Sequence, residues 1–222
     1  MGFAGRRRSY DRARILSQAE RARRRGRAAK AVEFYRRVLA VEPENVDLHR
    51  KVAPLLVRCG QPEEAWRCYR FAVKTLAGRG FEAHATGLLR EAAAQLPENR
   101  DVWIALADRI RKEGRLVDAK GVLLTGRAHF RRRRHRRDAI ELLARAEALD
   151  PDDLTVGLDL ARLLAQCSDR ARALQILERL AGSEPTRQRR IYFERFRVAP
   201  NLHSLTDWLH TLARRTPTRA VA

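Results

Sequence analysis

The chain has 222 residues, of which 45% are hydrophobic and 33% are charged. This is the composition of a folded globular protein and excludes an intrinsically disordered chain or a membrane protein. The net charge of +20, with 42 arginines against 5 lysines, predicts attraction to polyanions or acidic proteins and is uninformative about the fold.

The sequence shows no membrane or disulfide signal. No run reaches the roughly 18 apolar residues that span a bilayer, and residues 1–9 lack the apolar stretch of a secretory signal, so we expect no membrane insertion. An arginine-rich start would also suit a mitochondrial presequence, although Asp11 and Glu20 argue against it. An odd number of cysteines without CxxC spacing favours the reducing cytoplasm.

Amphipathic helices are predicted along most of the chain, because apolar residues recur three and four apart. Glycine or proline stands at nearly every joint between them, where it would end a helix. The expected helices cover residues 8–23, 28–42, 46–59, 62–77, 81–96, 100–113, 116–131, 135–150, 154–167 and 170–182. Pro54 lies inside one of them and predicts a local kink.

The sequence repeats with a period of 54 residues, or three helices. The segments AVEFYRRVLAVEPEN (31–45), ATGLLREAAAQLPEN (85–99) and AIELLARAEALDPDD (139–153) align without gaps. Alanines also align within the helices that follow. They are Ala53, Ala107 and Ala161, and then Ala65, Ala119 and Ala173. Small residues let neighbouring helices approach closely, so the sequence predicts an all-α solenoid of antiparallel helices.

The repeat resembles the tetratricopeptide repeat (TPR) family over roughly residues 8–183. The resemblance rests on a large–small pattern around a turn glycine, in Trp103, Leu106, Ala107, Ile110, Gly114, Ala119 and Leu123. It implies a TPR-like solenoid of bacterial type that binds other proteins. The family period is about 34 residues, so 54 adds one helix. Either the equivalent turns alternate between the two edges of the solenoid, or a longer crossover keeps them on one edge.

The last part of the chain breaks the repeat. We expect a basic tail at 1–7, the repeat domain at 8–183, a C-terminal segment with a capping helix at 184–215, and a disordered tail at 216–222. Ser204 followed by Asp207 resembles a capping box that opens the capping helix. Its apolar face would comprise Leu205, Trp208, Leu209 and Leu212. Alternatively, this helix binds a partner and is held by Tyr192, Phe193 and Phe196.

The run RRRRHRR, residues 131–137, is placed in the turn between the helices at 116–131 and 135–150. It is either a solvated turn that favours a helix C-terminus, a docking site for phosphate or carboxylate groups, or a targeting signal. Aromatic residues for base stacking are lacking, so nucleic-acid binding there would be nonspecific. The candidate polyanion patch is Arg131, Arg132, Arg133, Arg134, Arg136 and Arg137.

The sequence contains no convincing catalytic, cofactor or metal motif. Its six histidines are scattered, and the acidic pairs Glu63–Glu64 and Asp152–Asp153 stand at helix starts, where they would cap backbone N–H groups. We therefore expect a non-enzymatic scaffold without a cofactor, which binds an acidic peptide or helix of a partner protein. The candidate partner-binding residues are Arg50, Arg58, Arg109, Arg111, Lys112 and Arg162, on the first helix of each repeat.

Overall fold

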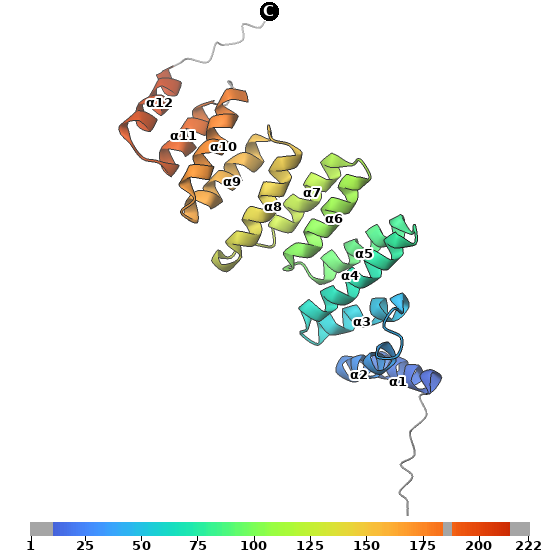
Figure 1. The fold of residues 1–222 in the computed structure, drawn as a ribbon. Coiled ribbons are helices and arrows are strands. Elements are labelled where there is room, and N and C mark those ends of the chain that lie inside the picture. Colours follow the sequence, from blue (N-terminus) through green and yellow to red (C-terminus); the bar gives the residue numbers. More distant parts are fainter. Residues whose placement is uncertain (1–10, 184–187, 214–222) are drawn as a thin grey trace, which may run out of the picture. The chain divides into compact units, whose positions relative to one another are not determined.

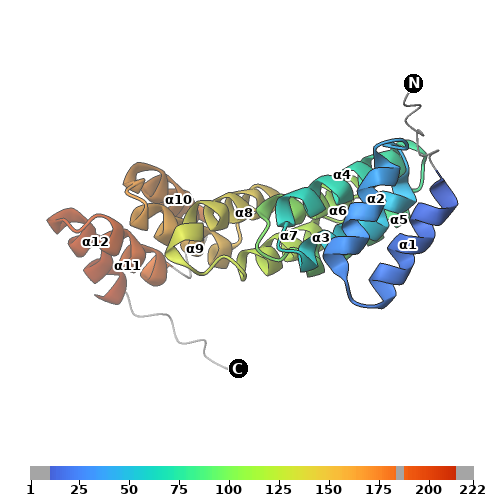
Figure 2. The same ribbon diagram turned by 90° about the horizontal axis from the view of Figure 1, so that it is seen from below.

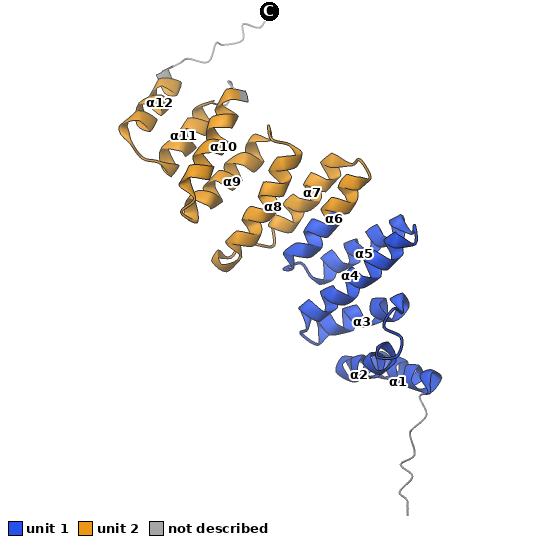
Figure 3. Ribbon diagram, in the orientation of Figure 1, with its two compact units in different colours: residues 1–106 blue, residues 107–222 orange. Residues whose placement is uncertain are grey.

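The computed structural model describes residues 11–183 and 188–213, and every regular element within them is a helix (Figure 1). This confirms the predicted all-α class. The predicted tails at 1–7 and 216–222 lie outside the described residues. The chain divides into two compact units, residues 1–106 and 107–222 (Figure 3), which are described separately below.

Unit 1 is a stack of antiparallel helices. It contains α1 (Arg12–Arg24), α2 (Ala28–Leu39), α3 (Val46–Arg58), α4 (Pro62–Gly78), α5 (Glu82–Gln95) and the first part of α6 (Arg100–Lys112). The most extensive contacts join α1 to α2 and α3 to α4. The core between them is apolar, and the aligned residues Ala53 and Ala65 are fully buried in it. This burial confirms the predicted role of small residues at helix crossings.

Unit 2 repeats the arrangement. After the end of α6 it contains α7 (Leu116–Arg127), the short 3-10 helix η1 (Arg133–His135), α8 (Arg136–Leu149), α9 (Leu154–Gln166), α10 (Arg170–Ser183), α11 (Gln188–Val198) and α12 (Leu202–Ala213). Helix α9 contacts α11 as well as its chain neighbours α8 and α10 (Figure 2). Alternate helices of this unit therefore share a layer.

The helix bounds agree with the sequence prediction to within a few residues, but the recurring structural unit is the helical hairpin. Odd-numbered helices begin at residues 12, 46, 82, 116, 154 and 188, which are 34 to 38 residues apart. This spacing is close to the family period of about 34. The 54-residue sequence period spans one and a half hairpins, and it does not recur as a three-helix structural unit among the described helices.

Tight turns recur where the sequence repeat predicts them. Gly60 and Gly114 have φ of 73° and 79°, in the left-handed region that glycine adopts at low cost. Ser168 occupies the equivalent place in the next repeat, with φ of 67°. The repeat thus imposes the same backbone conformation even where its glycine is missing.

Two ring side chains secure the first helix of successive repeats in the same way. Trp103 donates its Nε1–H to the carbonyl of Pro97 at 3.0 Å, and His49 Nε2 lies 2.8 Å from the carbonyl of Pro43. The two residues are equivalent in the 54-residue register, so His49 takes over the polar contact of the tryptophan. Helix α3 itself continues through Pro54.

The C-terminal segment contains two described helices, α11 and α12, and its predicted cap is wrong by one helical turn. Asn201, rather than Ser204, is the capping residue. Its Oδ1 accepts from Ser204 N at 2.7 Å, while Asn201 N donates to Ser204 Oγ at 3.2 Å. Asp207 instead pairs with Arg195 at 3.5 Å. The predicted apolar face is incompletely covered, since Leu209 is 48% exposed.

Aromatic side chains join these two helices. Phe196 stacks on Trp208 with ring centroids 6.1 Å apart, and Phe193 lies 5.3 Å from the same ring. These contacts hold α12 against α11.

Candidate functional site

A groove in unit 1 is lined by three alternate helices, α1, α3 and α5. Its larger pocket has a volume of about 600 Å³, and an adjoining pocket of about 310 Å³ shares Arg50 and Glu91 with it. The larger pocket is lined by Arg23, Asp47, Arg50, Lys51, Pro54, Leu55, Arg58 and Glu91. The smaller one adds Ala83, His84, Gly87 and Leu88.

Helical spacing explains why α3 dominates this groove. Its lining residues recur three, four, seven and eight positions apart, so they form one face of the helix. The residues between them, including Val52, Ala53 and Leu56, are buried on the opposite face. The sequence analysis expected the first helix of every repeat to line the binding surface. In unit 1 only α3 does so, and α1 and α5 supply the other walls.

Glu20 neutralises two of the groove's cations. It lies 2.8 Å from Arg23 and 3.2 Å from Lys51, and it accepts a hydrogen bond of 2.7 Å from the Tyr35 hydroxyl. The Tyr35 hydrogen bond is the largest influence on the Glu20 carboxyl. Together with Arg23 and Lys51 it outweighs burial and lowers the pKa of Glu20 to about 2. This cluster joins α1, α2 and α3, and it occupies Arg23 and Lys51 within the fold.

Arg50 and Arg58 remain as the available cations of the groove. Arg50 is 4.0 Å from Asp47, whose side chain is 84% exposed, so that pair is weak. Arg58 has no ion pair with a described carboxylate, and its side chain lines the larger pocket. The floor between these arginines is apolar, at Pro54 and Leu55.

The other predicted partner-binding residues lie elsewhere. Arg109, Arg111 and Lys112 are on the last part of α6. Arg111 is 3.6 Å from Asp108, and Arg109 is only partly exposed. Of the six residues predicted, only Arg50 and Arg58 line a common pocket.

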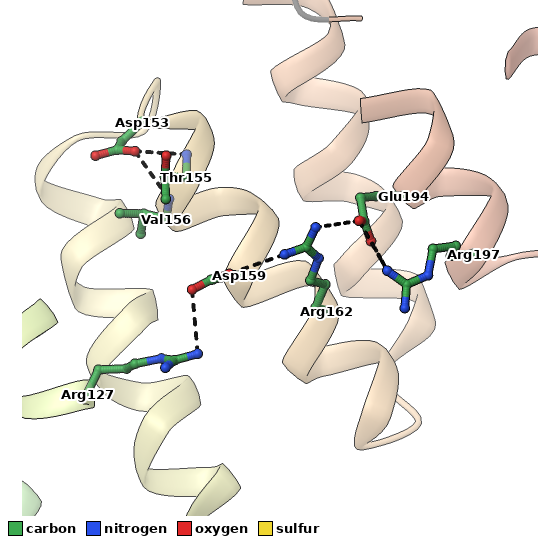
Figure 4. A network of polar contacts seen from close by, with 8 residues as sticks. All are labelled: Arg127, Asp153, Thr155, Val156, Asp159, Arg162, Glu194 and Arg197. Atoms are coloured by element: carbon green, nitrogen blue, oxygen red, sulfur yellow. Dashed lines mark hydrogen bonds and ion pairs between the residues drawn. The ribbon is translucent and has the colours of Figure 1, made fainter. Parts of the chain in front are cut away.

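Arg162 belongs to a polar network inside unit 2 (Figure 4). Its guanidinium donates to Glu194 at 2.5 Å and lies 3.6 Å from Asp159. Arg127 of α7 reaches Asp159 at 3.5 Å, and Arg197 lies 3.3 Å from Glu194. Arg162 therefore ties α9 to α11, and this internal role removes it from the candidate partner surface.

The buried acid of this network stays charged. Only 3% of Glu194 is exposed, and this burial by itself would raise its pKa. The hydrogen bond and charge of Arg162, with the charge of Arg197, outweigh the burial and lower the pKa of Glu194. In the same network, Asp153 caps α9 by accepting from the backbone N–H groups of Thr155 and Val156, as predicted for that acidic pair.

The arginine run 131–137 is only partly a turn. Helix α7 ends at Arg127, earlier than predicted, and Arg136 and Arg137 already belong to α8. The four arginines 131–134 are exposed, and Arg134 donates to His135 Nε2 at 2.8 Å. Within the described residues, none of the six arginines of the run forms an ion pair with a carboxylate.

Several groove residues were missed by sequence reasoning. Arg23 and Glu91 lie on helices that were not expected to line the surface, and Pro54 was interpreted only as a source of curvature. The helical spacing of Asp47, Arg50, Pro54 and Arg58 on α3 was the available signal.

Metal and membrane features were also compared with expectation. Among residues 11–183 and 188–213, no three His, Cys, Asp or Glu side chains are grouped as metal ligands would be. In the same ranges, no helix has the length and apolar character needed to cross a bilayer.

Comparisons with known proteins agree with the helical repeat. Residues 132–192, from η1 to the start of α11, match the family model of the tetratricopeptide repeat. No curated protein gives a significant match. Three solved structures are similar to the chain. A tetratricopeptide repeat protein from Parabacteroides merdae is 14% identical, with 93% of this chain and 94% of that chain covered and a TM-score of 0.34.

The other two are PilF from Pseudomonas aeruginosa and MamA from Desulfovibrio magneticus. PilF is 18% identical, with coverages of 93% and 92% and a TM-score of 0.29. MamA is 16% identical, with coverages of 80% and 97% and a TM-score of 0.29. With its helical hairpins, its 34 to 38-residue spacing and the family match over residues 132–192, this chain is a TPR-like helical repeat protein.

Proposed function

We propose that this protein is a non-enzymatic scaffold that binds an acidic peptide or helix of a partner protein in the groove of unit 1. The observation that supports this proposal most strongly is the placement of Arg50 and Arg58. Both line a groove with an apolar floor, and neither is engaged in a close ion pair with a described carboxylate. Helical repeat proteins use such concave surfaces to bind extended partners. The free cysteines Cys59, Cys68 and Cys167 suit a reducing, cytoplasmic location.

The spacing of the two arginines defines the ligand. They are eight residues apart on α3, which corresponds to about 12 Å along the helix axis. An extended peptide would place carboxylates at that separation when they are about four residues apart. A partner helix would do so with acids seven or eight residues apart. Small apolar residues between them would contact Pro54 and Leu55.

The test is a charge reversal in the groove, Arg50→Glu with Arg58→Glu. Partners are captured from native lysate with nuclease present, identified, and their binding is then measured with purified proteins. We expect the affinity for the acidic partner to fall at least about tenfold, because two charge-assisted contacts become repulsive.

The matched control is Arg67→Glu with Arg70→Glu, the same change in net charge at two exposed positions on α4. It should leave the affinity within about twofold. Equal weakening by both pairs would mean that only the overall charge attracts the partner, and the groove assignment would then be wrong.

A second candidate function is nonspecific binding of nucleic acid or another polyanion by the arginine run. The specific support is that six arginines at 131–134, 136 and 137 have no carboxylate partner among the described residues. Changing Arg131 to Arg134 to serine should weaken retention of nucleic acid at low salt and reduce the slope of log affinity against log salt by about 3. Unchanged retention would exclude this patch.

A further inference from the structure

A second pocket of unit 1 lies between α1 and α2, beside the turn that connects them. Its volume is about 240 Å³. It is lined by Gln18, Arg21, Ala22, Arg25, Arg27, Lys30 and Phe34. Four of these seven residues are cationic and none is acidic, whereas the groove described above contains both signs of charge.

The four cations have no acidic partner in the described part of the chain. The printed contact of Arg21 is a 3.3 Å hydrogen bond to the carbonyl of Ser17. Neighbouring arginines of the same helices are neutralised, because Arg23 pairs with Glu20 and Arg36 pairs with Glu64. Uncompensated charge is therefore concentrated in this pocket.

Helix electrostatics account for only part of this arrangement. Arg21 and Arg25 lie at the C-terminal end of α1, where cations are favourable. Arg27 and Lys30 lie at the N-terminal end of α2, where the helix dipole opposes positive charge. The first turn of α2 contains no acidic residue, and its N-cap residue Arg27 makes no side-chain capping hydrogen bond. An anion bound in the pocket would compensate all four charges.

We propose that this pocket binds the oligophosphate group of a ligand. Guanidinium groups bind phosphate oxygens with two parallel hydrogen bonds, and several cations in one small pocket favour a ligand with several negative charges close together. The volume is below the 300–1,000 Å³ usual for sites that enclose a drug-sized molecule. It therefore suits a chain of two or three phosphates, with Phe34 and Ala22 forming an apolar side. This inference is independent of the proposed partner groove.

The experiment measures binding of inorganic triphosphate to the full chain by calorimetry at about 150 mM salt. The test variant is Arg21→Gln with Lys30→Gln, which removes one cation from each helix. The control is Arg67→Gln with Arg70→Gln on α4, which lowers the net charge equally. We expect one triphosphate per chain, affinity reduced at least about tenfold in the test variant, and a change of less than about twofold in the control.

A second arm distinguishes a free oligophosphate from the phosphodiester chain of a nucleic acid, with a single-stranded oligonucleotide lacking terminal phosphates as the probe. Selective loss of triphosphate binding in the test variant supports the proposal. Three results would overturn it: no triphosphate binding at 150 mM salt, equal losses in both variants, or tight binding of the oligonucleotide alone. Circular dichroism confirms that each variant is folded.

Discussion

Ser168 shows how the repeat constrains a single backbone position. It ends α9 at the place where Gly60 ends α3 and Gly114 ends α6. A left-handed conformation costs a residue with a Cβ atom about 1 kcal/mol more than it costs glycine. The sequence alignment of these three positions therefore contained a conformational prediction that a serine alone would not suggest.

Replacing this serine with glycine should stabilise the protein. We expect Ser168→Gly to raise the free energy of unfolding by about 0.5 kcal/mol, since the relief of strain exceeds the extra entropy of glycine in the unfolded chain. Urea denaturation followed by circular dichroism measures the change. The reciprocal variant Gly114→Ser should lose about 0.5–1 kcal/mol. A decrease for Ser168→Gly would show that the serine side chain makes a compensating contact.

At the level of packed helices, the Arg162–Glu194 pair is the clearest link between α9 and α11. Removing its charge with Glu194→Gln should destabilise the protein by about 2 kcal/mol, because Arg162 and Arg197 lose a buried acceptor. Chemical denaturation at pH 7 provides the measurement. The control Glu178→Gln changes an acid whose side chain is 58% exposed and lies 3.5 Å from Arg195, and it should cost less than about 1 kcal/mol.

The same pair predicts a pH dependence with a definite sign. The pKa of Glu194 is lowered in the folded protein, so its stabilising contribution is complete above the ordinary glutamate value of 4.5. The contribution decreases as the pH falls through the lowered folded value. The difference in stability between wild type and Glu194→Gln should therefore narrow under acidic conditions. A constant difference from pH 7 down to pH 3 would contradict the assigned charge state.

The C-terminal cap shows the limit of local sequence patterns. Asn201 and Ser204 can each cap a helix, and Asp207 follows Ser204 at the spacing of a capping box. The chosen cap depends on where the chain leaves α11 and where Trp208 meets Phe196. Those contacts place the helix start at Leu202, one turn before the predicted position.

The charge of the entire chain has a further consequence for stability. With a net charge of +20, repulsion between distant cations opposes folding. Salt screens interactions beyond about 10 Å more strongly than ion pairs at hydrogen-bond distance. Raising the salt concentration from about 20 to 200 mM should therefore increase the midpoint of thermal unfolding by about 2–4 °C.

A charge-reduced variant tests this explanation. With Arg131 to Arg134 changed to serine, the midpoint should rise less over the same range of salt, because four exposed cations have been removed. Scanning calorimetry measures both proteins. A midpoint that falls with salt would mean that the attractive pairs, including Arg36–Glu64 and Lys120–Asp150, outweigh the repulsion.

The all-α fold, the helix bounds and the small residues at helix crossings could all be predicted from the sequence. They depend on interactions between residues a few positions apart, such as the glycine at the end of a helix or an apolar residue every third or fourth position. The groove and the ion-pair partners could not. Lys51 meets Glu20 across 31 positions and Arg162 meets Glu194 across 32. A long arginine or lysine side chain has many carboxylates within reach in sequence terms, and helix packing determines which one it meets. Arg162 was therefore assigned to the partner surface although it is engaged internally, while Arg50 and Arg58 remain in the groove because packing leaves them without a close acid.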